Sequence, residues 1–261
     1  MNNTAEIIDT HCHLDIDEFN PDRDEVLQNA RHAGVIAQII PAIDASGWGK
    51  LLELCGVHQD LYPALGLHPV FLEHHTQADL ETLAAAIATA RPVAIGEIGL
   101  DFAIKSLDRD KQRQLFEAQL VIAKNARLPV IIHARKSHDE VIKLLRKHHI
   151  SGGSIHAFSG SLQQGMHYYE MGFKLGFGGM LTFERSRKLR QLAHELPAEA
   201  LLLETDSPDM TVASHRGERN SPQYLPQVLA ALAVARDESV EDVAHYTTNN
   251  ARAIFHLEEY P

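Results

Sequence analysis

Histidine and carboxylate side chains recur in this sequence directly after short apolar runs, a pattern typical of metal ligands. Six such residues are candidate metal ligands: His11, His13, Glu97, His133, His156 and Asp206. Side chains alternate along a strand, so His11 and His13 are predicted to point to one side and Cys12 to the other. Burying six unpaired ionisable groups would be costly, which favours a metal site over a hydrogen-bonded polar plug. Six ligands exceed the need of one catalytic ion, whereas two ions sharing a carboxylate would use them all.

The elements that must position these ligands are short apolar runs, each followed by a helical pattern. The expected strands are Ile7–Thr10, Val35–Pro41, Leu61–His68, Pro92–Gly99, Pro129–His133, Ser154–Phe158, Phe173–Gly178 and Ala200–Thr205. The expected helices are Asp22–Ala33, one within Ala45–Val57, Asp79–Ala90, Asp108–Ala126, His138–His148, Leu162–Met171, Ser186–His194, Pro222–Arg236 and Val240–Phe255.

This alternation predicts an α/β protein, a TIM-type (β/α)8 barrel that forms a single domain over residues 1–261. The six ligands lie at or near the carboxyl ends of the expected strands, where barrel enzymes place their active sites. An open doubly wound sheet is the main alternative. No glycine-rich turn opens its first helix, as a dinucleotide site would require.

Composition and charge exclude several classes of protein. The chain has 261 residues, with 24 Lys or Arg against 35 Asp or Glu, so its formal net charge is −11. Hydrophobic residues make up 44%, which excludes intrinsic disorder and a disulfide-dense mini-domain. The negative charge argues against broad electrostatic binding to DNA or an anionic membrane, so a phosphate-bearing ligand needs a local positive centre. Two cysteines and no signal-peptide pattern predict a cytoplasmic protein without a membrane partner, and we expect a monomer.

Three motifs carry a resemblance to a known family. Residues 7–15 (IIDTHCHLD), 129–139 (PVIIHARKSHD) and 203–208 (LETDSP) are similar to the signatures of the TatD family of metal-dependent hydrolases. Residues 96–101 (GEIGLD) and 156–160 (HAFSG) fit the blocks between them. The resemblance covers residues 7 to about 255 and is closest to the bacterial YjjV-type branch. It implies a barrel of the metallo-dependent hydrolase type, and a metal-dependent deoxyribonuclease with the six residues above as metal ligands.

From this resemblance we expect two divalent ions, of zinc, magnesium or manganese, with Glu97 bridging them. His11 and His13 with Asp206 would complete one ion, and His133 with His156 the other. Glu97 and Asp206 are the expected catalytic residues, because Asp206 is placed to steer a metal-activated hydroxide and to accept its proton. The expected substrate is DNA, cleaved in an exonuclease-like way from an end or as a single strand.

Four more residues are candidates for substrate binding. Arg135 follows a ligand by two positions and could clamp a phosphate, or form an exposed salt bridge. His68 could contact substrate or a leaving group, or belong to the core. Ser159 and Asn220 could donate to a phosphate, although loop residues of these types usually serve turns. Many family members carry Arg-Asn-Glu-Pro where this chain has RNSP at residues 219–222, so the role of that loop stays open.

Two other function classes remain open. The same ligands suit attack on carbon, as in an amidohydrolase of small C–N substrates or a deacylase of mischarged aminoacyl-tRNA. The chain could also be a non-catalytic metal-binding barrel. An open mouth argues against that interpretation, because a structural metal site is closed.

Overall fold

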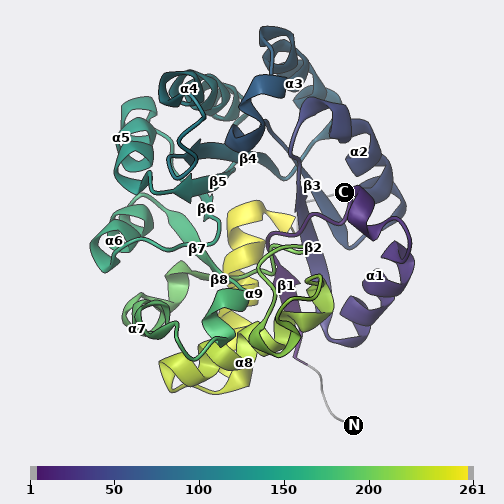
Figure 1. Cartoon of the computed structure of the whole chain (residues 1–261), viewed down its shortest axis with the longest axis vertical. Helices are drawn as coiled ribbons and strands as arrows, with labels where there is room; N and C mark the ends of the chain where they lie inside the picture. Colours follow the sequence, from purple (N-terminus) through teal and green to yellow (C-terminus); the bar gives the residue numbers. More distant parts are fainter. Residues whose placement is uncertain (1–4, 258–261) are drawn as a thin grey trace.

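Eight parallel strands follow one another in chain order, each hydrogen-bonded to the next (Figure 1). They are β1 (Ile7–Asp9), β2 (Val35–Pro41), β3 (Leu61–Leu65), β4 (Ala94–Asp101), β5 (Val130–Arg135), β6 (Gly153–Ile155), β7 (Phe173–Phe177) and β8 (Leu201–Leu203). This computed structural model describes residues 5–257, so residues 1–4 and 258–261 of the expected single domain lie outside the described part. Every expected strand is present, with small differences at its ends.

The ring of strands is closed by contacts between β1 and β8. The Thr10 backbone N–H donates to the Leu203 carbonyl oxygen at 3.0 Å. The Asp9 carboxylate, which is fully buried, accepts from the backbone N–H of Thr205 at 2.9 Å and from its hydroxyl at 2.6 Å. These bonds confirm the expected (β/α)8 barrel, and they exclude the open doubly wound sheet.

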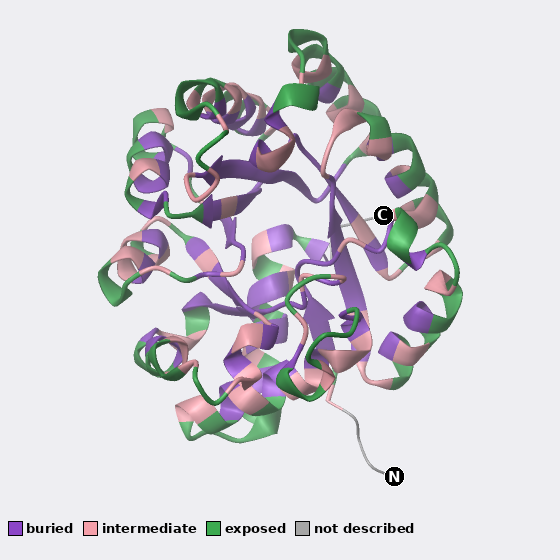
Figure 2. Cartoon of the chain, viewed as in Figure 1, coloured by how far each residue is buried: buried purple, intermediate pink, exposed green. Residues whose placement is uncertain are grey.

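Helices surround the barrel with one face inward (Figure 2). They are α1 (Arg23–His32), α2 (Trp48–Val57), α3 (Gln77–Ala90), α4 (Arg109–Ala126), α5 (His138–His148), α6 (Leu162–Glu170), α7 (Arg187–Glu195), α8 (Leu225–Arg236) and α9 (Val240–Phe255). Side-chain oxygens of Asp108, Ser161 and Ser239 accept from backbone N–H groups at the starts of α4, α6 and α9, which explains where these helices begin. Within residues 5–257, no helix combines the length and apolar character needed to cross a membrane.

The last helix, α9, has a different place from the others. It contacts β1, β6, β7 and β8, and in Figure 1 it lies within the outline of the barrel. Its Ala251 and Phe255 pack in one apolar cluster with Ile8, Ile39 and Leu202 from the strands. The helix therefore covers the barrel at the end opposite the carboxyl ends of the strands, and leaves those ends open.

We predict that Phe255→Ala destabilises the barrel strongly. The side chain is 1% exposed, and truncating a buried phenylalanine costs about 3–5 kcal/mol because it leaves a cavity. Urea unfolding of the purified protein measures the change. Val234→Ala on α8, at 80% exposure, is the matched control and should alter the free energy of unfolding by less than about 0.5 kcal/mol. Equal effects of the two variants would contradict the role given to α9.

Candidate metal centre

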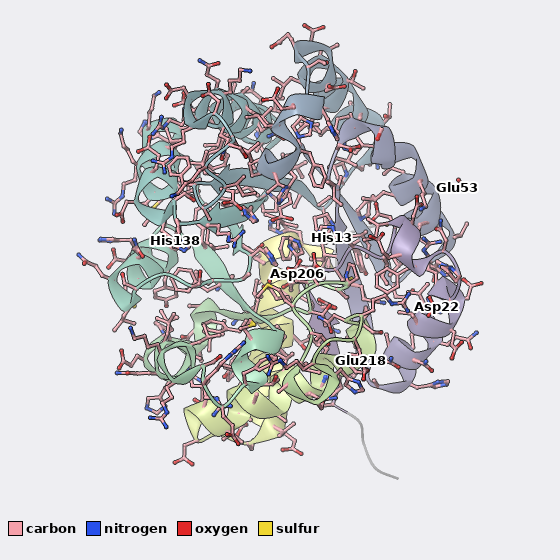
Figure 3. All side chains as sticks on the ribbon, viewed as in Figure 1. His13, Asp22, Glu53, His138, Asp206 and Glu218 are labelled. Carbon is pink, nitrogen blue, oxygen red and sulfur yellow. The ribbon has the colours of Figure 1, made fainter. Side chains whose placement is uncertain are left out.

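The six predicted ligands converge at the carboxyl end of the barrel, together with His68. Ligand atoms lie within 4.8 Å of one another in three overlapping groups: His11, Glu97 and His156; His11, His13 and Asp206; His68, Glu97 and His133. In Figure 3, the labelled His13 and Asp206 lie near the middle of the ring, whereas Asp22 and Glu53 lie at its periphery. Residues from β1, β4, β5, β6 and β8 are thus brought to one place.

His11 and His13 follow β1 on a short segment that backbone hydrogen bonds hold in place. The Asp206 backbone N–H donates to the His11 carbonyl at 2.8 Å, and the Cys12 N–H donates to the Ile39 carbonyl at 3.1 Å. The two histidines point the same way, and their Nε2 atoms are 3.2 Å apart. The Nδ1 of His13 lies 3.1 Å from the Pro41 carbonyl oxygen. A carbonyl only accepts, so Nδ1 carries the hydrogen and Nε2 presents a lone pair to the site.

A β-bulge directs Glu97 into the site. Ile95 of β4 pairs with Val130 of β5, and Ile98 pairs with Ile132, so three steps along β4 match two along β5. Such a bulge re-aims the side chain next to it and is common beside active sites. The Glu97 carboxylate is consequently buried, at 2% exposure.

Each oxygen of Glu97 faces a different set of imidazoles. Oε2 lies 3.1 Å from His11 Nε2 and 3.7 Å from His13 Nε2. Oε1 lies 3.0 Å from His133 Nδ1 and 3.3 Å from His68 Nε2. This is the arrangement required of a carboxylate that bridges two cations.

The carboxylates of the site favour the ionised form. Burial raises the pKa of Glu97, but the neighbouring His68 and His11 outweigh burial and hold that pKa well below its ordinary value. Burial also raises the pKa of Asp206, but His156 outweighs burial and lowers that pKa to about 2. Among the imidazoles, burial lowers the pKa of His11, whereas at His156 the carboxylates of Glu204 and Asp206 outweigh burial and raise the pKa well above its ordinary value. A bound cation would displace such a histidine proton, because metal ligands must be deprotonated.

Two further carboxylates stand behind the histidines. Asp101 Oδ2 lies 3.1 Å from His133 Nε2, and Glu204 Oε1 lies 3.0 Å from His156 Nδ1. Burial lowers the pKa of His133, but its two carboxylate partners outweigh burial and raise that pKa to about 9. A Cβ at Gly176 would overlap the Glu204 carboxylate, which explains the glycine. Carboxylates placed this way orient metal-binding histidines.

Asp101 and Glu204 are functional side chains that the sequence pattern did not single out. Both are buried at 1% exposure, and both lie at the carboxyl ends of strands, Asp101 at the end of β4 and Glu204 after β8. Their position at the carboxyl ends of strands was the one feature of the sequence that could have identified them as site residues. Their partners could not be read from the sequence, because each contact joins two different strands.

His68 lies among the candidate ligands. It is 8% exposed, and its Nδ1 accepts from the Val70 backbone N–H at 3.1 Å. In the neutral ring, Nε2 then carries the hydrogen and points it at Glu97. His68 is therefore a hydrogen-bond donor to the carboxylate, whereas a metal ligand would need a lone pair at that nitrogen. Its contacts are with Glu97 and His133, and the predicted contact with substrate gains no support from this geometry.

A cleft of about 530 Å³ opens over the site, lined by His133, His156, Asp206 and other residues. Arg135 lines it with a side chain that is 63% exposed and 3.7 Å from Asp101. Ser159 also lines the cleft and is exposed. Both are thus placed where a substrate would lie.

Asn220 does not reach the cleft with a free donor. It is 1% exposed, and its Nδ2 donates to the carbonyls of Thr205 at 2.8 Å and Asp209 at 2.7 Å. Both amide hydrogens are therefore used to hold the loop after β8. This corrects the expectation that Asn220 donates to a substrate phosphate.

The donor set fits divalent cations. Three acceptor atoms surround His11 Nε2, namely Glu97 Oε2, Asp206 Oδ1 and His13 Nε2, and the single ring hydrogen of a neutral His11 cannot satisfy all three. The Nδ1 of His11 is buried and has no hydrogen-bond partner within residues 5–257. Mixed imidazole and carboxylate ligands suit zinc and manganese.

Comparisons with known proteins agree with this geometry. A family model described as "TatD related DNase" matches residues 8–256. The chain is 41% identical over 253 residues to "Uncharacterized metal-dependent hydrolase YjjV" of Escherichia coli K12, covering 96% of this chain and 98% of that protein. It is 32% identical over 259 residues to "3'-5' ssDNA/RNA exonuclease TatD" of Erwinia tasmaniensis, covering 96% and 100%.

The likeness extends to three dimensions. The crystal structure of YjjV, a TatD homologue from E. coli K12, matches with a TM-score of 0.93 at 40% identity, over 97% of this chain and 99% of that chain. The residues matched by the family model run from within β1 to the end of α9 and include all six predicted ligands. The resemblance seen in the three motifs is thereby confirmed, and the chain belongs to the TatD family of metal-dependent hydrolases.

Proposed function

We propose that this hydrolase is a phosphodiesterase that cleaves DNA as a single strand or from an end. The observation that carries the proposal is the placement of Glu97, whose two oxygens face separate sets of imidazoles beneath a cleft that exposes Arg135. The name of the Erwinia relative, a single-stranded DNA and RNA exonuclease, supports the same substrate class.

Two divalent ions are proposed, held in the way the ligand geometry allows. Glu97 would bridge them, His11 and His13 with Asp206 would hold one, and His133 with His156 the other. Bound there, the ions would supply a positive charge that lowers the pKa of water and offsets charge developing on the phosphate. They would also provide the local positive centre that a chain with net charge −11 needs near an anionic substrate.

The side chains of the cleft have separate roles in this proposal. Asp206 is half-buried at the cleft, where its carboxylate can orient the attacking water and accept its proton. Arg135 can place two N–H donors against a phosphate and fix its orientation. Asp101 keeps the His133 ring in place from behind.

Metal binding can be tested without activity. In metal-stripped protein, adding zinc or manganese should raise the melting temperature, because a ligand at 100 times its Kd stabilises by about 2.7 kcal/mol. Glu97→Gln should lose most of this effect, since the amide keeps the shape but not the charge. Asp237→Asn, at an exposed position that caps the carboxyl end of α8, is the control. A titration of wild type that ends below two ions per chain would contradict the bridge.

Asp206→Asn should keep the fold and most of the bound metal but lower kcat on DNA by about 100-fold or more. An amide oxygen can still bind a cation, but it cannot take a proton at neutral pH. Turnover is measured with end-labelled single-stranded DNA at saturating metal, and metal content by elemental analysis. A variant that retains the wild-type rate would exclude Asp206 as the proton acceptor.

The variant Arg135→Ala should distinguish a phosphodiesterase from an amidohydrolase or deacylase. We expect the variant to lose activity on phosphodiesters more than on uncharged esters or amides, because only the former have anionic oxygens to clamp. Rates on both substrate classes are compared at saturating metal, with exposed Arg146→Ala on α5 as the control. Equal losses would assign Arg135 to the fold. A loss confined to the uncharged substrate would favour the amidohydrolase.

A further inference from the structure

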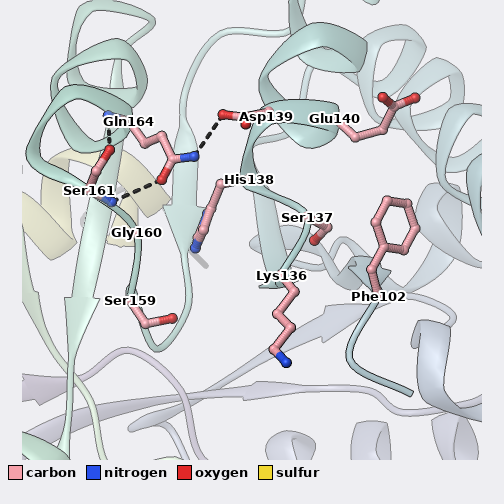
Figure 4. A pocket seen from close by; sticks show the side chains of 10 residues that line it. All are labelled: Phe102, Lys136, Ser137, His138, Asp139, Glu140, Ser159, Gly160, Ser161 and Gln164. Atoms are coloured by element: carbon pink, nitrogen blue, oxygen red, sulfur yellow. Dashed lines mark hydrogen bonds between the residues drawn. The ribbon is translucent and has the colours of Figure 1, made fainter. Parts of the chain in front are cut away.

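A second pocket lies beside the metal centre, between the loops that follow β5 and β6 (Figure 4). We call it the β5–β6 pocket. It encloses about 710 Å³ and is lined by Phe102, Lys136, His138, Ser159 and neighbouring residues. Ser159 also lines the cleft over the metal centre, so the two spaces adjoin. A volume of this size is typical of a site for a small organic ligand, for which pockets measure about 300–1,000 Å³.

His138 supplies the pocket with a buried polar atom that lacks a partner. The residue is 7% exposed, and its ring packs against Phe158 and Tyr168. Its Nε2 has no hydrogen-bond partner within residues 5–257. Figure 4 shows the ring pointing into the pocket, toward the space that Lys136 also enters. Buried polar atoms are almost always hydrogen-bonded, so this nitrogen indicates a ligand.

The contacts on the other side of the ring determine what Nε2 offers. The Tyr168 hydroxyl donates to the His138 carbonyl oxygen at 3.3 Å, and the same hydroxyl oxygen lies 3.3 Å from His138 Nδ1. A hydroxyl has one hydrogen, so both contacts are hydrogen bonds only if Nδ1 donates. Burial also lowers the pKa of His138 to about 4, so the ring is neutral at pH 7. Nε2 is therefore an acceptor that needs a hydroxyl or amine.

Lys136 supplies the pocket with positive charge. It is exposed and makes no ion pair within residues 5–257. Two acidic side chains also line the pocket: Glu140 is paired with the Arg113 guanidinium at 3.0 Å, and Asp139 accepts from the Gln164 amide at 2.7 Å. The amino end of α5, which starts at His138, adds a weak preference for anions.

We propose that the β5–β6 pocket binds the nucleotide unit next to the phosphodiester under attack. Lys136 faces a phosphate oxygen of that unit, and His138 accepts a hydrogen bond from a hydroxyl or amine of its sugar or base. A nucleotide carries both an anionic phosphate and hydrogen-bond donors of this kind. When one phosphate of a strand lies at the metal centre, the neighbouring nucleotide of that strand reaches the adjoining β5–β6 pocket. This inference rests on the proposed phosphodiesterase function and adds the site that selects nucleotides over other phosphodiesters.

Binding to the metal-free protein tests the pocket apart from catalysis. The probe is 2′-deoxyadenosine 3′,5′-bisphosphate, whose base carries the amine that His138 needs, titrated by calorimetry. We expect Lys136→Gln and His138→Phe each to raise its Kd about tenfold, the value of one contact worth about 1.4 kcal/mol. Lys143→Gln removes the same charge from the neighbouring helix α5, outside the pocket, and is the matched control. If Lys136→Gln leaves the Kd at the control value, the proposal is wrong, even where His138→Phe fails to fold.

Catalysis then separates this inference from the function on which it rests. Bis(p-nitrophenyl) phosphate carries no nucleotide. The two other esters are isomers of 2′-deoxyadenosine bisphosphate, with the p-nitrophenyl group on the 3′-phosphate in one and on the 5′-phosphate in the other. Wild type should favour one isomer by kcat/KM, and Lys136→Gln should reduce that preference about tenfold. Hydrolysis of all three esters without preference would overturn the pocket alone. Hydrolysis of none, with any metal, would overturn the phosphodiesterase and the pocket together.

Discussion

The structure depends on one costly feature, an ionised carboxylate buried inside a barrel. Glu97 is 2% exposed, and a buried charge is tolerated only when donors or opposite charges surround it. Three histidines lie within 3.3 Å of its oxygens, Asp101 lies behind one of them, His133, and Glu204 lies behind the neighbouring His156. Around His11 the centre has more acceptor atoms than hydrogens. Divalent cations are the simplest way to balance it, which is why the fold and the hydrolytic chemistry cannot be separated.

The barrel meets this requirement with backbone as much as with side chains. The bulge in β4 turns Glu97 inward, and the segment after β1 is held between Ile39 and the chain near Asp206. Backbone groups also set the hydrogens of the imidazoles, through the Pro41 carbonyl for His13 and the Val70 N–H for His68. The first presents a lone pair and the second a hydrogen. Two histidines that face the same carboxylate are therefore suited to different tasks.

Positive charge is available near the cleft of this acidic protein. The chain is acidic overall, with net charge −11, yet Arg135 and Lys136 follow each other at the carboxyl end of β5 and serve adjoining spaces. An acidic surface does not attract nucleic acid from a distance. For the proposed phosphodiesterase, binding would then depend on a few contacts near the phosphate in the cleft.

The sequence by itself determined the barrel and the six residues that meet at its mouth. Runs such as Val35–Pro41 are apolar because both faces of the strand are buried, and that burial leaves a local pattern. Tertiary structure alone decided the rest: Asp101 behind His133, His68 on Glu97, Asn220 within a loop, and α9 across the end of the barrel. The physical reason is that periodicity along a chain reports which residues are buried. The partner of each buried group comes from another strand or loop, and no spacing within one segment encodes it.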